Sequence, residues 1–207
     1  MGRTKTIDDD ELLRRAREVF RESGHTASTR EVARAARISQ AVLYQRFGSK
    51  DNLFFRAMTP DPPDLAALLG PYPPRSARAD LKRIGERLAG YLASLMPILL
   101  HVLAHPDLGH DRLMKWHEGL PFQTLVAALA DRFRRLKEDG LLGGVDPAAS
   151  ARAFLAAVHS AALFETMTHH EPREGPRGHV ESLVDVLWAG LAPAEGGRSK
   201  QGRANTD

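Results

Sequence analysis

Side chains that can recognise a nucleic acid gather in one short stretch near the start of the sequence. Gln40, Gln45 and Arg46 lie close together in that stretch. The amide of glutamine matches the major-groove edge of adenine, and the guanidinium of arginine matches that of guanine. Tyr44 and Lys50 suit phosphate oxygens, which fix the position of a protein on the duplex without reading its sequence. These residue types predict a DNA-reading surface in which Gln45 and Arg46 contact base edges.

Small, hydroxylated and basic residues around this stretch complete the predicted DNA-binding set. Ala41 is small enough to allow close approach to a base or contact with the methyl group of thymine. The hydroxyl groups of Ser28 and Ser39, and the free N–H groups at the helix starts that follow them, are expected to bind phosphates. The complete set is Ser28, Thr29, Arg37, Ser39, Gln40, Ala41, Tyr44, Gln45, Arg46 and Lys50.

Short helices must position these side chains, and the sequence predicts where they begin. Ser28 and Glu31 form a capping box, which predicts the start of one helix. Ser39 is expected to cap the next helix, and Ser49 is expected to cap a further one. The spacing within residues 28–47 is that of a helix-turn-helix, whose second helix enters the major groove of DNA.

The distribution of charge favours an anionic partner for the front of the chain. The 207 residues include 29 Lys+Arg and 26 Asp+Glu, for a net charge of +3 and a pI near 9.4. Residues 1–50 hold 11 basic and 7 acidic residues, a net of +4, whereas residues 51–195 hold 15 and 18, a net of −3. A basic N-terminal quarter on a mildly acidic body is typical of a nucleic-acid-binding protein.

The rest of the sequence predicts helices and no strands, so the expected fold is all-α. The predicted organisation is a helix-turn-helix DNA-binding domain over residues 1–58, a proline-rich connection over 59–79 with a helical turn near 65–69, a helical ligand-binding and dimerisation domain over 80–193, and a disordered tail over 194–207. A helix that begins at Asp80 is expected to kink or end at Pro97, because proline lacks the N–H group that a helix interior uses.

The composition of the sequence also indicates in which cellular compartment the protein acts. The chain has no cysteine, which excludes disulfides, thiolate zinc sites and cysteine nucleophiles. Its N-terminus has no apolar signal segment, and the apolar stretch over residues 92–100 is too short to span a bilayer. We therefore expect a cytoplasmic protein with no membrane span.

The segment from Glu18 to Met58 carries residues whose types and spacing follow the sequence pattern of a known family. The matching residues are Phe20-Arg-Glu-Ser-Gly24, Ser28-Thr29, Val32-Ala33, Ile38-Ser39, Leu43-Tyr44, Phe47 and Lys50-Asp51-Asn52-Leu53. In this pattern the segment resembles the N-terminal domain of TetR-family transcriptional regulators. It departs from the family at the turn, where Arg37 replaces a glycine, and a left-handed backbone there costs a non-glycine residue about 1 kcal/mol.

The resemblance implies a homodimer that binds a near-palindromic operator in double-stranded DNA. Helices over about 147–168 and 177–191 would pack against a two-fold mate, and the two heads would lie roughly 34–36 Å apart. The resemblance also implies a ligand cavity among the middle helices. Candidate lining residues are Tyr91, Leu95, Met96, Leu99, His101, Trp116, Phe122, Val126, His159 and Phe164. The expected function is that of a repressor released from its operator by a small apolar or amphipathic ligand.

Alternatives to a ligand-responsive regulator remain open. One is a DNA-binding regulator with no small-molecule effector, and another is an enzyme with an incidental helix-turn-helix. No nucleophile motif, phosphate-binding loop or paired carboxylates support catalysis. His101 and His105 are four residues apart and His169-His170-Glu171 is compact, but no third ligand follows at a suitable spacing, so no metal or cofactor is expected. The helix over 147–168 could instead form the core of a monomer.

Overall fold

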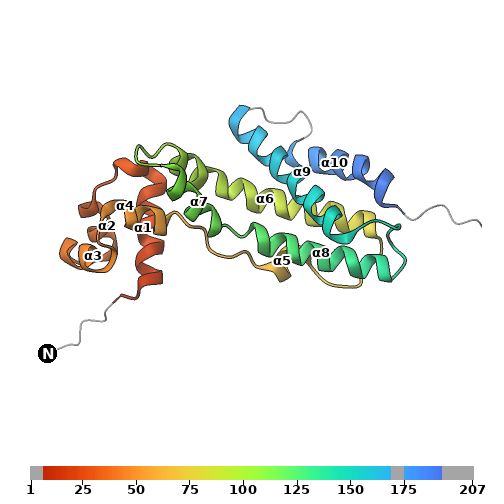
Figure 1. The fold of residues 1–207 in the computed structure, drawn as a ribbon, viewed down its shortest axis with the longest axis horizontal. Helices are drawn as coiled ribbons and strands as arrows, with labels where there is room; N and C mark the ends of the chain where they lie inside the picture. The colour runs from red at the N-terminus through yellow and green to blue at the C-terminus, as the bar shows by residue number, and fades with distance from the viewer. Residues whose placement is uncertain (1–6, 169–174, 193–207) are drawn as a thin grey trace, which may run out of the picture. The chain divides into compact units, whose positions relative to one another are not determined.

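The computed structural model describes residues 7–168 and 175–192, and within these ranges it is helical, with no β-strand (Figure 1). The expected all-α fold is thus confirmed. The helices are α1 (Asp9–Ser23), α2 (Thr29–Ala36), α3 (Gln40–Phe47), α4 (Lys50–Ala57), α5 (Leu65–Leu69), α6 (Ala77–Leu103), α7 (His110–Glu118), α8 (Phe122–Glu138), α9 (Pro147–Thr168) and α10 (Gly175–Leu191), and a 3₁₀ turn, η1 (Gly24–Thr26), follows α1.

The chain forms two compact units, and neither is one continuous segment. The first unit consists of Met1–Pro63 and Tyr91–Phe122, and the second of Asp64–Gly90 and Gln123–Asp207. The long helix α6 therefore contributes its N-terminal half to the second unit and its C-terminal half to the first. The predicted boundary at residues 59–79 divides the chain by sequence order and stays a prediction.

Helices α1 to α4 build the core of the first unit around one face of α1. Leu12, Ala16 and Phe20 recur at every fourth position of α1 and are fully buried, as expected for an amphipathic helix. Phe20 meets Phe54 of α4 edge to face, with ring centroids 5.0 Å apart. Aromatic pairs in this geometry stabilise a core beyond the area that they bury.

Residues from α6 and α7 complete the same core. Ile98 and Val102 of α6 and Trp116 of α7 are buried in one cluster with the side chains of α1 to α4. The indole Nε1 of Trp116 donates a hydrogen bond to the carbonyl oxygen of Met58 at 3.1 Å. A buried indole needs such a partner, so this bond fixes α7 against the end of α4.

Side-chain caps begin α2, α3 and α4 at the predicted residues. Ser28 Oγ accepts a hydrogen bond from the N–H of Glu31 at 3.2 Å, and the Glu31 carboxylate accepts one from the N–H of Ser28 at 2.7 Å. Ser39 and Ser49 accept hydrogen bonds from N–H groups in the first turns of α3 and α4. The capping box and both serine caps are therefore confirmed.

The turn between α2 and α3 keeps a left-handed residue although it has no glycine. Arg37 has φ 56° and ψ 41°, and it is the only non-glycine residue with positive φ in the described ranges. The N–H of Ile38 donates to the carbonyl oxygen of Ala33 at 3.0 Å and closes the end of α2. The turn thus accepts a backbone strain of about 1 kcal/mol at Arg37.

The second unit packs the N-terminal half of α6 with α8, α9 and α10. Phe133 of α8 and Phe154 of α9 meet with ring centroids 5.9 Å apart. A Cβ at Gly85 of α6 would lie 2.7 Å from a methyl carbon of Val180 on α10. Gly85 is therefore required for the close approach of α6 and α10.

Helix α6 does not end at Pro97, which excludes one of the two outcomes expected there, a kink or an end. The helix continues to Leu103 with Pro97 in its interior. The proline ring is exposed, whereas Met96, Ile98 and Val102 are buried. Burial of each such side chain contributes about 1.5–3 kcal/mol, which offsets the roughly 3 kcal/mol that an interior proline costs.

Because it continues through Pro97, α6 is much longer than the apolar stretch seen in the sequence. Of the helices in the described ranges, it alone is long and apolar enough to cross a membrane by length and composition. The core helix of a soluble protein meets the same criterion, and α6 buries Leu81, Ile84, Leu88 and Leu92 within the protein.

Candidate nucleic-acid interface

Helix α3 turns one face to the core and the opposite face to solvent. Leu43 and Phe47 are buried, while Gln40, Ala41 and Gln45 are exposed and Tyr44 is 49% exposed. The exposed residues occur at helical spacing and form a single stripe. Four of the predicted DNA-contacting residues therefore share one accessible face.

Thr29 lies behind this face rather than on it. It is the first residue of α2 and only 8% exposed. Gln40 Nε2 donates a hydrogen bond to Thr29 Oγ1 at 2.9 Å, and Tyr44 Oη lies 3.4 Å from the same oxygen. The predicted contact residue Thr29 is thus a partner of two exposed residues of α3.

Arg46 is held by the start of α1. Its Nη1 donates hydrogen bonds to the carbonyl oxygen of Ile7 at 2.8 Å and to Asp9 Oδ1 at 3.1 Å. The side chain is 22% exposed. The role of Arg46 as a base reader stays a prediction, and that role requires the guanidinium to exchange these partners for a base edge.

Two cationic side chains near α3 make no hydrogen bond or ion pair with the described residues. Arg37 and Lys50 lie on either side of α3 in sequence, and their side chains make no hydrogen bond or ion pair within the described ranges, although the charge of Lys50 contributes to lowering the pKa of Glu31. Arg37, Ser39 and Gln45 also line a groove of about 1150 Å³ beside α1. Unpaired cations beside an exposed helix are available for phosphate oxygens.

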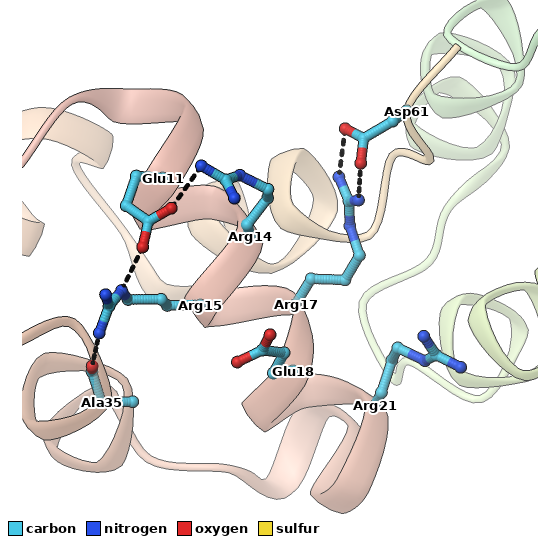
Figure 2. Close-up of a pocket in the computed structure, with 8 residues that line it drawn as sticks. All are labelled: Glu11, Arg14, Arg15, Arg17, Glu18, Arg21, Ala35 and Asp61. Atoms are coloured by element: carbon cyan, nitrogen blue, oxygen red, sulfur yellow. Dashed lines mark hydrogen bonds and ion pairs between the residues drawn. The ribbon is translucent and has the colours of Figure 1, made fainter. Parts of the chain in front are cut away.

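Three arginines of α1, by contrast, already have partners within the fold, and Figure 2 shows them around a neighbouring polar cleft of about 490 Å³: Arg14, Arg15 and Arg17. Arg15 Nη1 donates to the carbonyl oxygen of Ala35 at 3.0 Å, near the end of α2. Arg17 donates to the carbonyl oxygens of Ala57 and Thr59, both at 2.7 Å, at the end of α4. Cations stabilise helix C-termini, so Arg15 and Arg17 join α1 to α2 and α4.

A polar cluster that the sequence did not predict holds the first turn of α4 beside Lys50. Asp51 lies 3.7 Å from His105 Nε2 and 3.5 Å from Arg112 Nη1. The His105 ring is buried among aromatic rings of α4 and η1, with its centroid 4.9 Å from that of Phe54. Sequence reasoning considered His105 only as a metal ligand, because its partners lie far away in sequence.

Among the groups of this unit with displaced pKa values, His105 and Glu31 lie in or beside the elements that hold α3. Burial lowers the pKa of His105, and His25 and Arg112 lower it further, although Asp51 and Asp107 act in the opposite direction. The pKa of Glu31 is lowered chiefly by the hydrogen bond from the backbone of Ser28 and then by that from its side chain. Near neutral pH, therefore, His105 is uncharged and Glu31 is a carboxylate that keeps α2 capped.

The predicted ligand-lining residues divide between the two units. Tyr91, Leu95, Met96, Leu99, His101, Trp116 and Phe122 belong to the first unit, and Val126, His159 and Phe164 belong to the second. Trp116 is part of the core described above, and His101 Nε2 lies 3.0 Å from the carbonyl oxygen of Arg21. Phe164 is 66% exposed. The lining set stays a prediction.

A small apolar void in the second unit lies among other residues. It measures about 10 Å³ and is lined by Leu65, Leu68, Leu69, Ile84, Leu88, Leu125, Ala128 and Leu129, from α5, α6 and α8. A void of this size holds at most about one water molecule. Sequence reasoning missed the contribution of α5 because a five-residue helix with no buried residue has no hydrophobic period.

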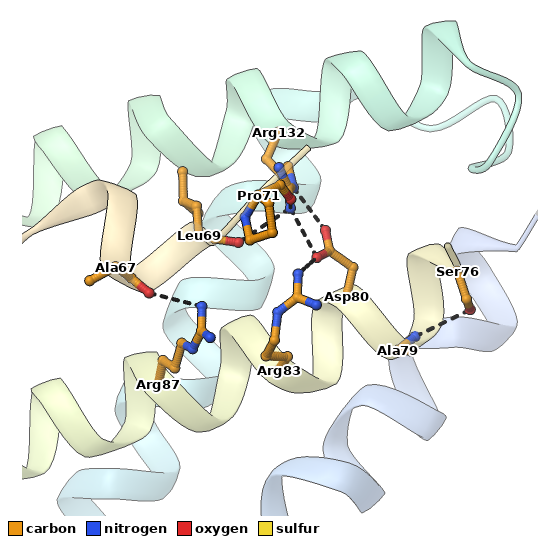
Figure 3. A network of polar contacts seen from close by, with 9 residues as sticks. All are labelled: Ala67, Leu69, Pro71, Ser76, Ala79, Asp80, Arg83, Arg87 and Arg132. Carbon is orange, nitrogen blue, oxygen red and sulfur yellow. Dashed lines mark hydrogen bonds and ion pairs between the residues drawn. The ribbon is translucent and has the colours of Figure 1, made fainter. Parts of the chain in front are cut away.

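A buried ion pair fixes the segment after α5 (Figure 3). Arg132 Nε lies 2.8 Å from Asp80 Oδ2, and both side chains are buried. Arg132 Nη2 also donates to the carbonyl oxygens of Leu69 at 3.2 Å and Pro71 at 2.9 Å. Arg83 donates a further hydrogen bond to Asp80. Asp80 and Arg132 therefore hold this segment against α6 and α8.

No metal centre is visible in residues 7–168 and 175–192: they contain no group of three or more His, Cys, Asp or Glu that could hold a metal ion. His169, His170 and Glu171, considered in the sequence as a compact cluster, lie outside the described residues.

Comparison with known proteins finds a family model that matches part of the first unit. Residues 12–57 match the model of bacterial regulatory proteins of the tetR family. No curated protein matches the sequence.

Among solved structures, one similar chain is a protein from Mesorhizobium loti MAFF303099 assigned to the TetR family, with 20% identity, a TM-score of 0.72 and coverage of 89% of this chain and 96% of that one. A TetR family transcriptional regulator from Pseudomonas syringae pv. tomato str. DC3000 has 20% identity, a TM-score of 0.62 and coverage of 90% and 99%. Salmonella enterica GusR has 19% identity, a TM-score of 0.60 and coverage of 85% and 92%. At these identities the likeness establishes a shared fold.

Proposed function

We propose that this chain, which its matched N-terminal domain identifies as a TetR-family DNA-binding transcriptional regulator, is a homodimeric repressor released from a near-palindromic operator by a small apolar or amphipathic ligand. In this proposal α3 enters the major groove, where Gln40, Gln45 and Arg46 contact base edges. Tyr44 and Lys50 contact phosphates. The protein would act in the cytoplasm.

The observation that carries the proposal is the exposed stripe of α3. Its amide and phenol groups face solvent on a short helix whose other face is locked in the core. The unpaired cations Arg37 and Lys50 flank it. A rigid helix with hydrogen-bonding side chains on its free face and cations at its ends has the properties that major-groove recognition requires.

Exposed apolar residues on the last two helices support a homodimer. Val186 of α10 is 75% exposed, and Phe164 of α9 is 66% exposed. Covering apolar side chains that face solvent favours association with a second copy. Packing α9 and α10 against a two-fold mate would cover them and bring two copies of α3 to one operator.

The apolar void between α5 and α8 supports a ligand-binding role for the second unit. Its lining is aliphatic throughout, and α5, which covers it, has no buried residue of its own. Displacing α5 would enlarge the void with little loss of core packing. A structure with 21% identity and a TM-score of 0.61 is a flavonoid-responsive regulator, FrrA, which supports an effector of apolar or amphipathic chemistry.

The small size of the same void favours the alternative of a DNA-binding regulator without a small-molecule effector. A volume of about 10 Å³ admits no metabolite as it stands. In that case a protein partner or the amount of the regulator would control occupancy of the operator.

Selection of bound DNA from a random pool, followed by release with a metabolite panel, tests both proposals. We expect the full chain to enrich a near-palindrome whose half-sites lie roughly 34–36 Å apart. Replacing Gln45 or Arg46 with alanine should change the preferred bases, by about 1–3 kcal/mol for each lost base contact. Failure to enrich any sequence would contradict operator binding, and an operator that no panel member releases would favour the alternative.

A further inference from the structure

The most informative polar group that the recognition surface leaves unexplained is a buried hydroxyl. We propose that Thr29 is a positioning residue whose single hydroxyl sets the donor and acceptor pattern of both the base reader Gln40 and the phosphate contact Tyr44. This inference rests on the proposed function of α3 as the recognition helix. It assigns Thr29 a role other than direct contact with DNA.

The position of the hydroxyl is fixed by the fold. Thr29 follows the capping residue Ser28, begins α2 and is 8% exposed. Its β-branched side chain has few rotamers in a helix. In the structure Oγ1 lies between α2 and α3, where it meets two side chains separated by one turn of α3, those of Gln40 and Tyr44.

The bond to Gln40 leaves that amide with a defined outward pattern. Gln40 Nε2 has two hydrogens, and one is donated to Thr29 Oγ1 at 2.9 Å. The second hydrogen and the carbonyl oxygen of the amide remain available. One donor and one acceptor in this arrangement complement N7 and the N6 amino group of adenine in the major groove. Thr29 thus favours the amide orientation that reads adenine.

The contact between Thr29 and Tyr44 determines in which direction the Tyr44 hydroxyl donates its hydrogen. Thr29 Oγ1 accepts from Gln40, so its own hydrogen is available to the phenol oxygen of Tyr44 at 3.4 Å. When Thr29 donates to that oxygen, the hydrogen of Tyr44 points away from α2 and can be donated to a phosphate. One buried hydroxyl thereby orders a base contact and a phosphate contact together.

Removing the hydroxyl should relax recognition at one base pair. A glutamine side chain has several rotatable bonds, and without Thr29 it would lose its fixed amide orientation. The freed amide can present its oxygen or its nitrogen to a base, so adenine would lose its advantage over the other bases. Positions read by Gln45 do not involve Thr29 and should keep their preference.

The test compares base preference at each operator position in full-length variants. Gln40→Ala first identifies the base pair that Gln40 reads. At that position we expect Thr29→Val, which keeps the side-chain shape, to reduce the preference for adenine by about fivefold or more. Thr29→Ser, which restores a hydroxyl, should keep the wild-type preference. In a Gln40→Ala background, Thr29→Val should cause no further change at this position.

Each outcome of this comparison either supports the positioning role of Thr29 or contradicts it. A Thr29→Val protein that keeps its preference for adenine, while Gln40→Ala loses it, would overturn the inference. An equal loss of preference at all positions would also overturn it, because that result indicates a general structural defect. Thr29→Ala serves the same test if the valine variant does not fold. If the wild type enriches no operator, the proposed function itself fails and this inference fails with it.

Discussion

At the scale of single residues, the basic side chains of the first unit fall into two groups. Arg15, Arg17 and Arg46 donate to carbonyl oxygens of other helices or of the segment before α1, so the fold itself uses their charge. The side chains of Arg37 and Lys50 make no hydrogen bond or ion pair with the described residues. Only the second group is available to DNA without a cost to the fold, and substitutions should separate the two groups.

Replacing Lys50 with alanine should weaken binding to all DNA sequences to a similar extent. A lysine that contacts a phosphate releases a counterion, so its loss should reduce the slope of log affinity against log salt by about one. The measurement is a salt titration of operator and non-specific DNA. Lys115→Ala is a matched control because Lys115 is exposed on α7 and has no partner in the described ranges. An unchanged slope for Lys50→Ala would rule out the phosphate contact.

The buried ring of His105 should make stability depend on pH. Because burial lowers the folded-state pKa of His105, the unfolded state takes up a proton first as the pH falls. The stabilisation is complete above the unfolded pKa, about 6.5, and is lost as the pH falls through the folded value. Wild-type unfolding free energy should therefore decrease below about pH 6.5, and His105→Gln should reduce that decrease. Equal pH profiles would show that His105 contributes nothing.

At the scale of elements, the interior proline of α6 offers a direct test of how packing overrides local preference. Pro97 is exposed and lies between buried Met96 and Ile98. Pro97→Ala should restore a backbone hydrogen bond and raise the free energy of unfolding by about 1–3 kcal/mol. Urea denaturation measures this change. Pro106→Ala, just beyond the end of the helix, should have little effect, and a destabilised Pro97→Ala protein would contradict the explanation.

Features that depend on residues close together in the sequence could be predicted. Features that depend on contacts between distant residues could not. The caps at Ser28, Ser39 and Ser49 were predicted because a cap and the N–H group that it accepts are three residues apart. The continuation of α6 through Pro97 depends on burial against other helices, which no local pattern reveals. The same reason explains why Asp51 and His105, 54 positions apart in the sequence, were not foreseen as partners.

For a related reason, only some features of the predicted DNA-binding site could be foreseen from the sequence. Helical spacing alone places Gln40, Tyr44 and Gln45 on one exposed face of α3. The same spacing gives no sign that Thr29 lies behind them or that Arg46 is held by α1, because both facts depend on how α3 packs against its neighbours. Residue type predicted the chemistry of the surface, and packing decides which side chains are available.

At the scale of the molecule, the stability of the second unit should depend on one buried ion pair. Arg132→Met removes the buried partner of Asp80 and leaves that carboxylate paired only with the partly exposed Arg83, so the free energy of unfolding should fall by up to about 3–5 kcal/mol. Asp80→Leu combined with Arg132→Met should cost less than the sum of the single changes. Chemical denaturation of the three variants and the wild type gives this comparison. Additive effects would contradict direct coupling between Asp80 and Arg132.

The core of α1 to α4 is not complete without side chains from later in the chain, and this matters for protein engineering. These side chains are Ile98, Val102 and Trp116. A DNA-reading head cut from this chain at residue 63 would lack these side chains, and the carbonyl oxygen of Met58 would lose its indole donor. Such a fragment would expose an apolar surface and aggregate. A hybrid regulator that borrows this head must therefore also borrow residues 91–122, so the specificity of the protein cannot be transplanted as one uninterrupted cassette.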